Sequence, residues 1–139
     1  MASVQFFTED ITFKIPQPRK TKEWILAVAR KEKATVRSLV YIFCSDSYLL
    51  QLNEGYLKHH TLTDIITFDY SEGRALEGEI YISVERVAEN AQKFKTDFRS
   101  ELNRVIIHGV LHLAGYKDKK PAEKALMRKK EDAYLSLLK

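Results

Sequence analysis

The sequence contains very little cysteine and no long hydrophobic run. Cys44 is the only cysteine among the 139 residues, which excludes an internal disulfide and a zinc site built from several cysteines. Because Cys44 ends a short apolar run and free cysteine is usually buried, we interpret it as a core residue rather than a nucleophile. Apolar runs such as 39–44 are far too short to cross a bilayer. The first residues lack the basic and apolar regions of a signal peptide, so we expect a cytoplasmic protein without a membrane segment.

A strong charge of either sign is also missing. Lysine and arginine together number 23 and aspartate and glutamate 19, which gives a net charge of +4. This mildly basic balance permits a polyanionic partner without requiring one. With 45% hydrophobic and 30% charged residues the composition is typical of a globular protein, and the length suits a single domain over residues 1–139.

The hydrophobic pattern predicts strands early in the chain and helices late in it. Alternating or β-branched apolar residues predict strands at 4–6, 11–15, 36–44, 65–68 and 79–82. Apolar residues at helical spacing predict helices at 21–33, 45–56, 84–94, 100–113 and from Pro121 onward. Thr21 and Ser83 are expected as N-caps of two of these helices. The order predicts an α+β fold in which helices pack on a small mixed β-sheet.

The most informative stretch ends at Asp118 and predicts a metal site. His108 and His112 are four residues apart on a very apolar helix, so both imidazoles can point from one face toward a shared position. Gly115 can adopt the left-handed conformation that ends a helix, and Asp118 then follows where a third ligand can approach. Three protein ligands leave one position for water, as in catalytic zinc sites. We therefore expect one Zn²⁺ per chain, held by His108, His112 and Asp118.

Three stretches of the sequence resemble the YbeY family of bacterial endoribonucleases. Residues 108–116 are similar to the family signature His-Gly-x-Leu-His-Leu-x-Gly-Tyr. The stretches 52–68 and 78–82 are similar to two further blocks of the family, in the same order. Together with the helices beside them, these blocks cover about residues 46–131.

Two positions depart from the family pattern. Asp118 stands where the family usually has a third histidine, but the spacing is kept and a carboxylate also binds zinc. Leu57 stands where the family usually has an arginine, so a cationic phosphate contact is absent there. The adjacent Lys58 carries a charge, but its side chain is expected to point elsewhere.

The resemblance implies a mixed sheet packed by helices, a cytoplasmic location and a zinc-dependent endoribonuclease. It also implies action on single-stranded RNA in the 3′-end maturation of small-subunit (16S) ribosomal RNA, with RNA and the small ribosomal subunit as partners and no DNA or membrane. The loop that carries Lys58, His59, His60 and Asp64 is implied to lie near the cleft, so these four residues are the candidates for catalytic groups. Each is otherwise an ordinary surface or turn residue. Attack by water and attack by the 2′-OH of the RNA are both open.

Other functions are consistent with the same ligands. Metzincin peptidases share the histidine spacing but carry a glutamate as general base directly after the first histidine, where this chain has Gly109. Two histidines and one carboxylate also form the iron site of non-haem oxygenases. A non-catalytic ribosome-binding factor with a structural metal is the third alternative.

Many basic residues follow the metal motif. They either track a phosphate backbone or form a solvated helix face, because acidic residues interrupt them. They are Lys117, Lys119, Lys120, Lys124, Arg128, Lys129 and Lys130.

Overall fold

The computed structural model describes residues 2–56 and 63–138, and its four strands form one mixed sheet in the order β1-β2-β4-β3. The strands are β1 (Val4–Thr8), β2 (Thr35–Cys44), β3 (Ile65–Asp69) and β4 (Ala75–Ser83). Strand β2 pairs in parallel with both β1 and β4, whereas β3 pairs antiparallel with β4. The most apolar strand is therefore an inner strand with a partner on each side, as its composition predicts.

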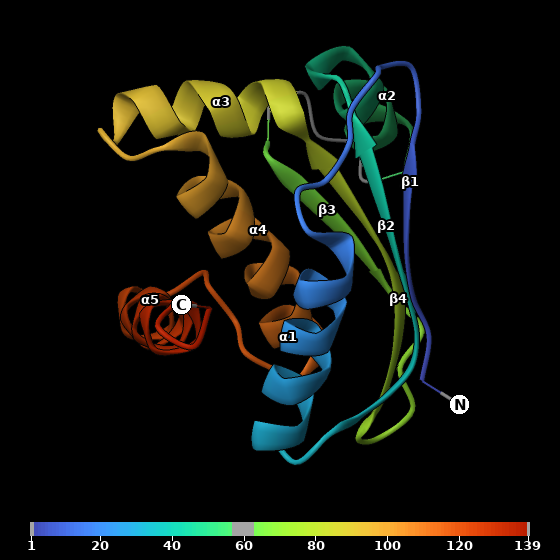
Figure 1. Cartoon of the computed structure of the whole chain (residues 1–139), viewed down its shortest axis with the longest axis vertical. Coiled ribbons are helices and arrows are strands. Elements are labelled where there is room, and N and C mark those ends of the chain that lie inside the picture. The colour runs from blue at the N-terminus through green and yellow to red at the C-terminus, as the bar shows by residue number, and fades with distance from the viewer. Residues whose placement is uncertain (1, 57–62, 139) are drawn as a thin grey trace.

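Helices cover both faces of this sheet. They are α1 (Pro18–Lys31), α2 (Asp46–Tyr56), α3 (Val84–Lys93), α4 (Phe98–Leu113) and α5 (Pro121–Leu135). Figure 1 shows α1 and α4 side by side on one face, with α3 across one end of the sheet and α5 on the outer side of α4. The expected α+β fold with a small mixed sheet is confirmed. Among the described residues, no helix is long and apolar enough to span a membrane.

Neighbouring residues of one strand contribute to two separate hydrophobic clusters. Ile80 and Ile82 of β4 belong to the main core under α1 and α4, whereas Tyr81 packs with Leu49 of α2 in a smaller cluster. This alternation follows from the pleat, which directs successive side chains to opposite faces.

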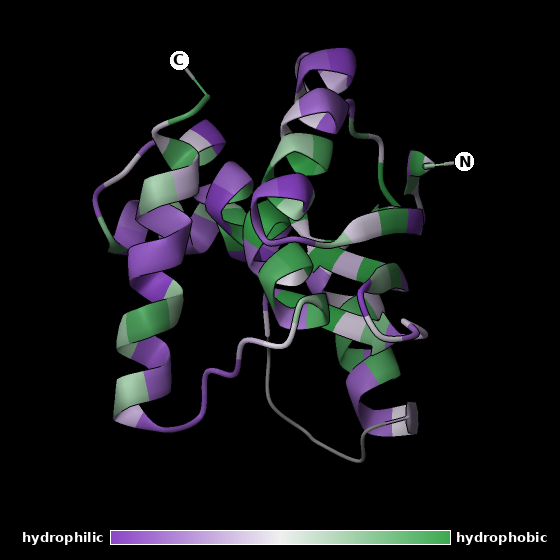
Figure 2. Cartoon of the chain, turned by 90° about the horizontal axis from the view of Figure 1, so that it is seen from below, coloured by the Kyte–Doolittle hydropathy of each residue, from purple (hydrophilic) through white to green (hydrophobic). Residues whose placement is uncertain are grey.

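Cys44 is fully buried in the smaller cluster, and burial raises the pKa of its thiol to about 12, so it is not a reactive thiolate. Hydrophobic segments gather in the interior, while α5, near the C label, is largely hydrophilic (Figure 2).

Two expectations about the N-terminal third are wrong. Residues 11–15 form no strand, although Ile11, Phe13 and Ile15 are half-buried and pack against the main core. An alternating pattern indicates which side chains contact the core. An extended segment that pairs with no other strand can show the same pattern. Thr21 is not an N-cap, because α1 begins earlier, at Pro18, whose ring is suited to a first helical turn.

The remaining elements agree with the expectations to within a few residues. Ser83 caps α3 by accepting a hydrogen bond from the amide of Arg86 at 3.0 Å. Helix α4 begins two residues before the expected start, where the Asp97 carboxylate accepts from the amide of Ser100 at 2.8 Å. Strand β4 is longer than expected because its first half pairs with β2 and carries mixed rather than continuous apolar residues.

Candidate metal centre

Helix α4 carries a polar stripe that includes both histidines. Glu101, Arg104, His108 and His112 follow one another at spacings of three, four and four residues, which places them along the same face. All four line one cleft. From residue 105 onward the other faces of α4 are buried in the core, so the direction of this stripe is determined by how the helix packs on the sheet.

The turn after α4 brings Asp118 back to the two histidines. Gly115 has φ = 108°, a conformation that residues with a Cβ rarely adopt, and it reverses the chain. Arg74 donates to a carbonyl at the end of α4 at 3.0 Å, and the Tyr116 hydroxyl donates to Glu32 at 2.7 Å. These contacts fix the turn on both sides of Gly115, and they therefore also fix the start of the segment that carries Asp118.

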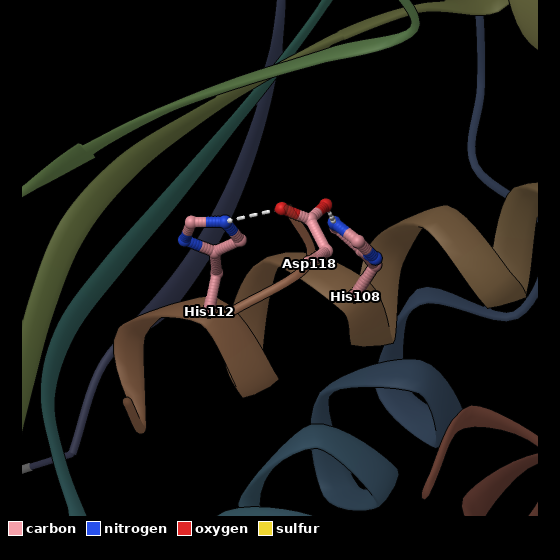
Figure 3. A group of neighbouring side chains, drawn as sticks. All are labelled: His108, His112 and Asp118. Carbon is pink, nitrogen blue, oxygen red and sulfur yellow. Dashed lines mark ion pairs between the residues drawn. The ribbon is translucent and has the colours of Figure 1, made fainter. Parts of the chain in front are cut away.

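The three expected ligands converge (Figure 3). The Nε2 atom of His108 lies 3.2 Å from one carboxylate oxygen of Asp118, and Nε2 of His112 lies 3.5 Å from the other. One ligand atom from each residue lies within 4.8 Å of the other two. Two ligands of a tetrahedral ion with bonds of about 2.0 Å are about 3.3 Å apart, so each of the two contacts, which end on different oxygens of Asp118, is close to the spacing around zinc. Two imidazoles and a carboxylate are also a donor set that zinc accepts.

The second ring nitrogen of His108 has its own partner. Nδ1 lies 2.7 Å from Oε2 of Glu131, a buried carboxylate on α5. Burial lowers the pKa of His108, but the hydrogen bond and charge of Glu131, with the charges of Asp118 and Asp64, outweigh it and raise this pKa above its usual value. Arg104 in turn donates to Glu131 at 3.0 Å.

A cleft of about 690 Å³ opens beside the two histidines and carries both acidic and basic groups. Asp64 and Glu101 line it, and burial raises the pKa of both carboxyls despite nearby cations. Lys124 and Arg128 of α5 supply positive charge to the same cleft. Phe94, with 56% of its surface exposed, adds an aromatic ring to the lining. Acid, base, aromatic and metal-ligating groups therefore share one opening.

Of the four catalytic candidates, the structure describes one. Asp64 lies in the cleft, whereas Lys58, His59 and His60, like Leu57, lie outside the described residues. Three further charged residues of the cleft were not expected from the sequence: Glu101, Arg104 and Glu131. Their spacing carried a signal, because Glu101 and Arg104 share the helix face of the two histidines and Glu131 shares the face of Met127 and Tyr134.

Gly109 follows His108 and lies against the sheet. A Cβ at this position would stand 3.1 Å from two side-chain atoms of Ile80 and 3.3 Å from Ile65. A glutamate would have to displace these strand residues before it could reach the cleft. The glutamate that serves as general base in metzincin peptidases is therefore absent, and the position of its Cβ lies against core side chains.

The basic stretch after the motif divides into two parts. Lys124 and Arg128 face the cleft, while Lys130 contacts Glu32 at 3.2 Å and stacks over the rings of Tyr116 and Tyr134. Contact with a phosphate backbone therefore stays a prediction, and among these residues it concerns Lys124 and Arg128, because they line the cleft.

Comparison with known proteins gives one consistent family. The chain is 51% identical to Endoribonuclease YbeY of Flavobacterium psychrophilum over 131 residues, which is 94% of either chain. It is 50% identical to Endoribonuclease YbeY of Cytophaga hutchinsonii over 138 residues, which covers 99% of this chain and 96% of the relative. The solution structure of TM1509 from Thermotoga maritima matches with a TM-score of 0.69 and 29% identity, covering 97% of this chain and 88% of that one.

The relatives and the fold agree with a match to the family as a whole. A sequence model of the family described as Endoribonuclease YbeY matches residues 4–139. The matched range includes α4, the Gly115 turn and α5, and thus every element that builds the cleft. The resemblance seen in three stretches extends over nearly the whole chain, and the chain belongs to the endoribonuclease YbeY family.

Proposed function

We propose that this protein is a zinc-dependent endoribonuclease that cleaves single-stranded RNA. Its role is the 3′-end maturation of small-subunit ribosomal RNA in the cytoplasm, in association with the small ribosomal subunit. The observation that carries the proposal is the convergence of His108, His112 and Asp118 at a cleft whose lining includes the cations Lys124 and Arg128. Membership of the endoribonuclease YbeY family supports the same activity.

His108, His112 and Asp118 hold one zinc ion in this proposal. When bound, zinc supplies a Lewis acid that withdraws charge from a phosphate and makes a coordinated water more acidic. The ligand atoms approach one another at distances that suit a tetrahedral ion, and the cleft leaves room beside them for a substrate.

Single-stranded RNA suits the other groups of the cleft. Lys124 and Arg128 can neutralise phosphates, a contribution that does not depend on sequence. An unpaired base can stack on an exposed aromatic ring such as Phe94, whereas a base within a duplex cannot. The combination favours a flexible single strand over a duplex.

Asp64 is the proposed proton acceptor for the attacking hydroxyl. Its carboxyl lines the cleft, and burial raises its pKa toward the range in which a general base works best. Asp64→Asn keeps the shape and removes this capacity, so kcat should fall by roughly 10²–10⁴-fold while bound zinc stays stoichiometric. An Asp64→Asn variant with the parental kcat would transfer the role to another group.

The experiment that tests the proposed function compares RNA and peptide substrates. Zinc-loaded protein should cleave a single-stranded RNA and leave casein intact, because Gly109, which has no side chain, stands where the peptidases carry their general base. His112→Ala, purified in the same way, should lose the RNA cleavage and thereby exclude a contaminating nuclease. Casein hydrolysis that disappears in His112→Ala, together with RNA cleavage that does not, would contradict the proposal.

A further inference from the structure

Glu131 is an acidic residue on the buried face of α5. Met127 and Tyr134 of the same helix are buried four residues before it and three residues after it. Its side chain is 6% exposed, yet it carries a carboxylate between two helices. A buried carboxylate is costly unless partners compensate it, so its contacts indicate what it does.

The two oxygens of Glu131 have different partners. Oε2 lies 2.7 Å from Nδ1 of His108, and Oε1 accepts from Arg104 at 3.0 Å. Arg104 also donates to Asp132 at 2.7 Å, which anchors the guanidinium from its other side. The carboxylate is therefore held in one orientation, with one oxygen directed at the imidazole.

This contact determines which nitrogen of His108 is available to a metal. A neutral imidazole has one N–H and one lone pair, and an ionised carboxylate can only accept a hydrogen bond. A proton on Nδ1 satisfies Glu131 and leaves the lone pair on Nε2. Nε2 is the nitrogen that lies 3.2 Å from Asp118.

We propose that Glu131 is a positioning residue of the metal centre, which holds the His108 proton at Nδ1 and leaves the Nε2 lone pair free for the metal position that His108 shares with His112 and Asp118. Arg104 supports it by fixing the carboxylate. The inference rests on the metal-binding part of the proposed function and assigns Glu131 no contact with substrate. Partners of this kind orient a ligating histidine and increase its basicity.

The competing explanation is that Glu131 only joins two helices through its ion pair with Arg104. That role predicts a loss of folding stability when Glu131 is changed, but no change in the tautomer of His108. Asp132 offers a matched control, because it is also bound to Arg104 and does not touch His108.

The first measurement is zinc affinity, by competition with a chromophoric chelator. Glu131→Gln keeps the shape of the side chain and removes its charge, and should lower the affinity by about 10–100-fold. Asp132→Asn keeps an oxygen that accepts from Arg104 and leaves both contacts of Glu131 in place, so it should bind zinc as the parent does. Equal affinity of parent and Glu131→Gln would overturn the inference.

The second measurement is the tautomer of His108, read from ¹⁵N chemical shifts at alkaline pH in metal-free protein that carries Asp118→Ala. This background is needed because the Asp118 carboxylate lies 3.2 Å from Nε2 and competes for the same proton when no metal is bound. His108 should then carry the proton on Nδ1, and adding Glu131→Gln should produce a population with the proton on Nε2, because an amide can donate to Nδ1. An Asp118→Ala protein with the His108 proton on Nε2 would refute the inference even if the double variant failed to fold. The tautomer is measured without metal, so absence of zinc binding by the parent would refute the proposed metal site separately from the contact between Glu131 and His108.

Discussion

At the scale of single residues, Asp118 is the one of the three proposed metal ligands that does not lie on α4. Each of its oxygens lies near a different histidine, at 3.2 Å and 3.5 Å, so the carboxylate contacts both imidazoles from one side. Its backbone comes from the turn after Gly115 rather than from α4. A ligand that arrives on a separate segment can be exchanged without altering the helix that carries the other two.

Two substitutions at Asp118 test its role. Asp118→Ala leaves two imidazoles, and the zinc affinity should fall by more than the ~10–100-fold that loss of an outer partner costs. Asp118→His places an imidazole at nearly the same reach and should retain one zinc per chain. Metal content and affinity, measured for the parent and both variants together, decide the matter. An alanine variant with the parental affinity would remove Asp118 from the site.

At the scale of secondary-structure elements, the end of α4 packs directly on the sheet at Gly78 of β4. A Cβ at Gly78 would stand 2.6 Å from the backbone oxygen of Phe68 and 3.2 Å from Leu113. Strand β3 pairs with β4 at this point, where Asp69 is opposite Gly78. The missing side chain therefore lets a neighbouring strand and the last turn of α4 approach the same backbone.

Gly78→Ala should lower the free energy of unfolding, because either the β3–β4 pairing or the end of α4 must move. Overpacking of this kind costs about 1–3 kcal/mol, which urea denaturation of the metal-free protein measures. Gly55→Ala in α2 is the matched control, since no described atom lies within 4 Å of its Cβ position. It should be neutral or stabilising by up to ~1 kcal/mol. Equal effects of the two substitutions would show that the close approach at Gly78 is not important for stability.

At the scale of the whole molecule, Glu32 connects three parts of the chain. It caps the C-terminal end of α1 and is bound by the hydroxyls of Tyr116 and Tyr134 and by Lys130 at 3.2 Å. Its side chain is 8% exposed. The first helix, the turn that delivers Asp118 and α5 therefore meet at one carboxylate.

The stability contributed by Glu32 should depend on pH. Burial raises its pKa, but the two hydroxyls and Lys130 outweigh burial and hold the pKa of Glu32 below its ordinary value of 4.5. A carboxyl with a lowered folded-state pKa stabilises the protein above its unfolded-state pKa, and this contribution is lost as the pH falls through the folded-state pKa. Glu32→Gln should thus cost roughly 1–3 kcal/mol at neutral pH, and the difference should shrink below about pH 4.5.

A control separates this effect from the general loss of a negative charge. Glu72, bound to Arg37 at 3.3 Å with 78% of its side chain exposed, should tolerate replacement by glutamine with little change in stability at any pH. Urea unfolding of the metal-free parent, Glu32→Gln and Glu72→Gln across acidic and neutral pH measures all three. A Glu32→Gln difference that does not vary with pH would contradict this account of the Glu32 carboxyl.

The charge on one side of α5 is also a property of the assembled molecule. Replacing both Lys124 and Arg128 by glutamine should weaken RNA binding and make log Kd less steep in log salt by about 1.4, since each phosphate contact on a single strand contributes about 0.7. Lys129 is exposed on the same helix but does not line the cleft, so Lys129→Gln is the control and should leave the slope unchanged. A slope that responds equally to all three positions would indicate general attraction to a basic surface.

The amino-acid sequence by itself determined the features that depend on local spacing. Residues four apart share a helix face whatever surrounds them, so the sequence alone placed His108 and His112 together. The apolar content of β2 predicted an inner strand, and the cap at Ser83 follows from one hydroxyl and the amides beside it. The prediction of a strand at 11–15 was wrong because alternation of apolar residues indicates contact with the core. Whether a neighbouring strand is present to pair with such a segment does not follow from its local sequence.

Only the tertiary structure decided which distant groups meet the two histidines. Glu131 is 23 residues from His108, and their contact exists because the buried face of α5 docks beside α4. In the sequence, Gly109 indicated only that the general base of a metzincin peptidase is missing. In the structure, α4 lies close to Ile80 and Ile65 of the sheet at this glycine. The division of the basic residues between the cleft and Glu32 likewise depends on the rotation of α5. These contacts join elements whose relative position is set by burial of the whole core, which no short stretch of sequence encodes.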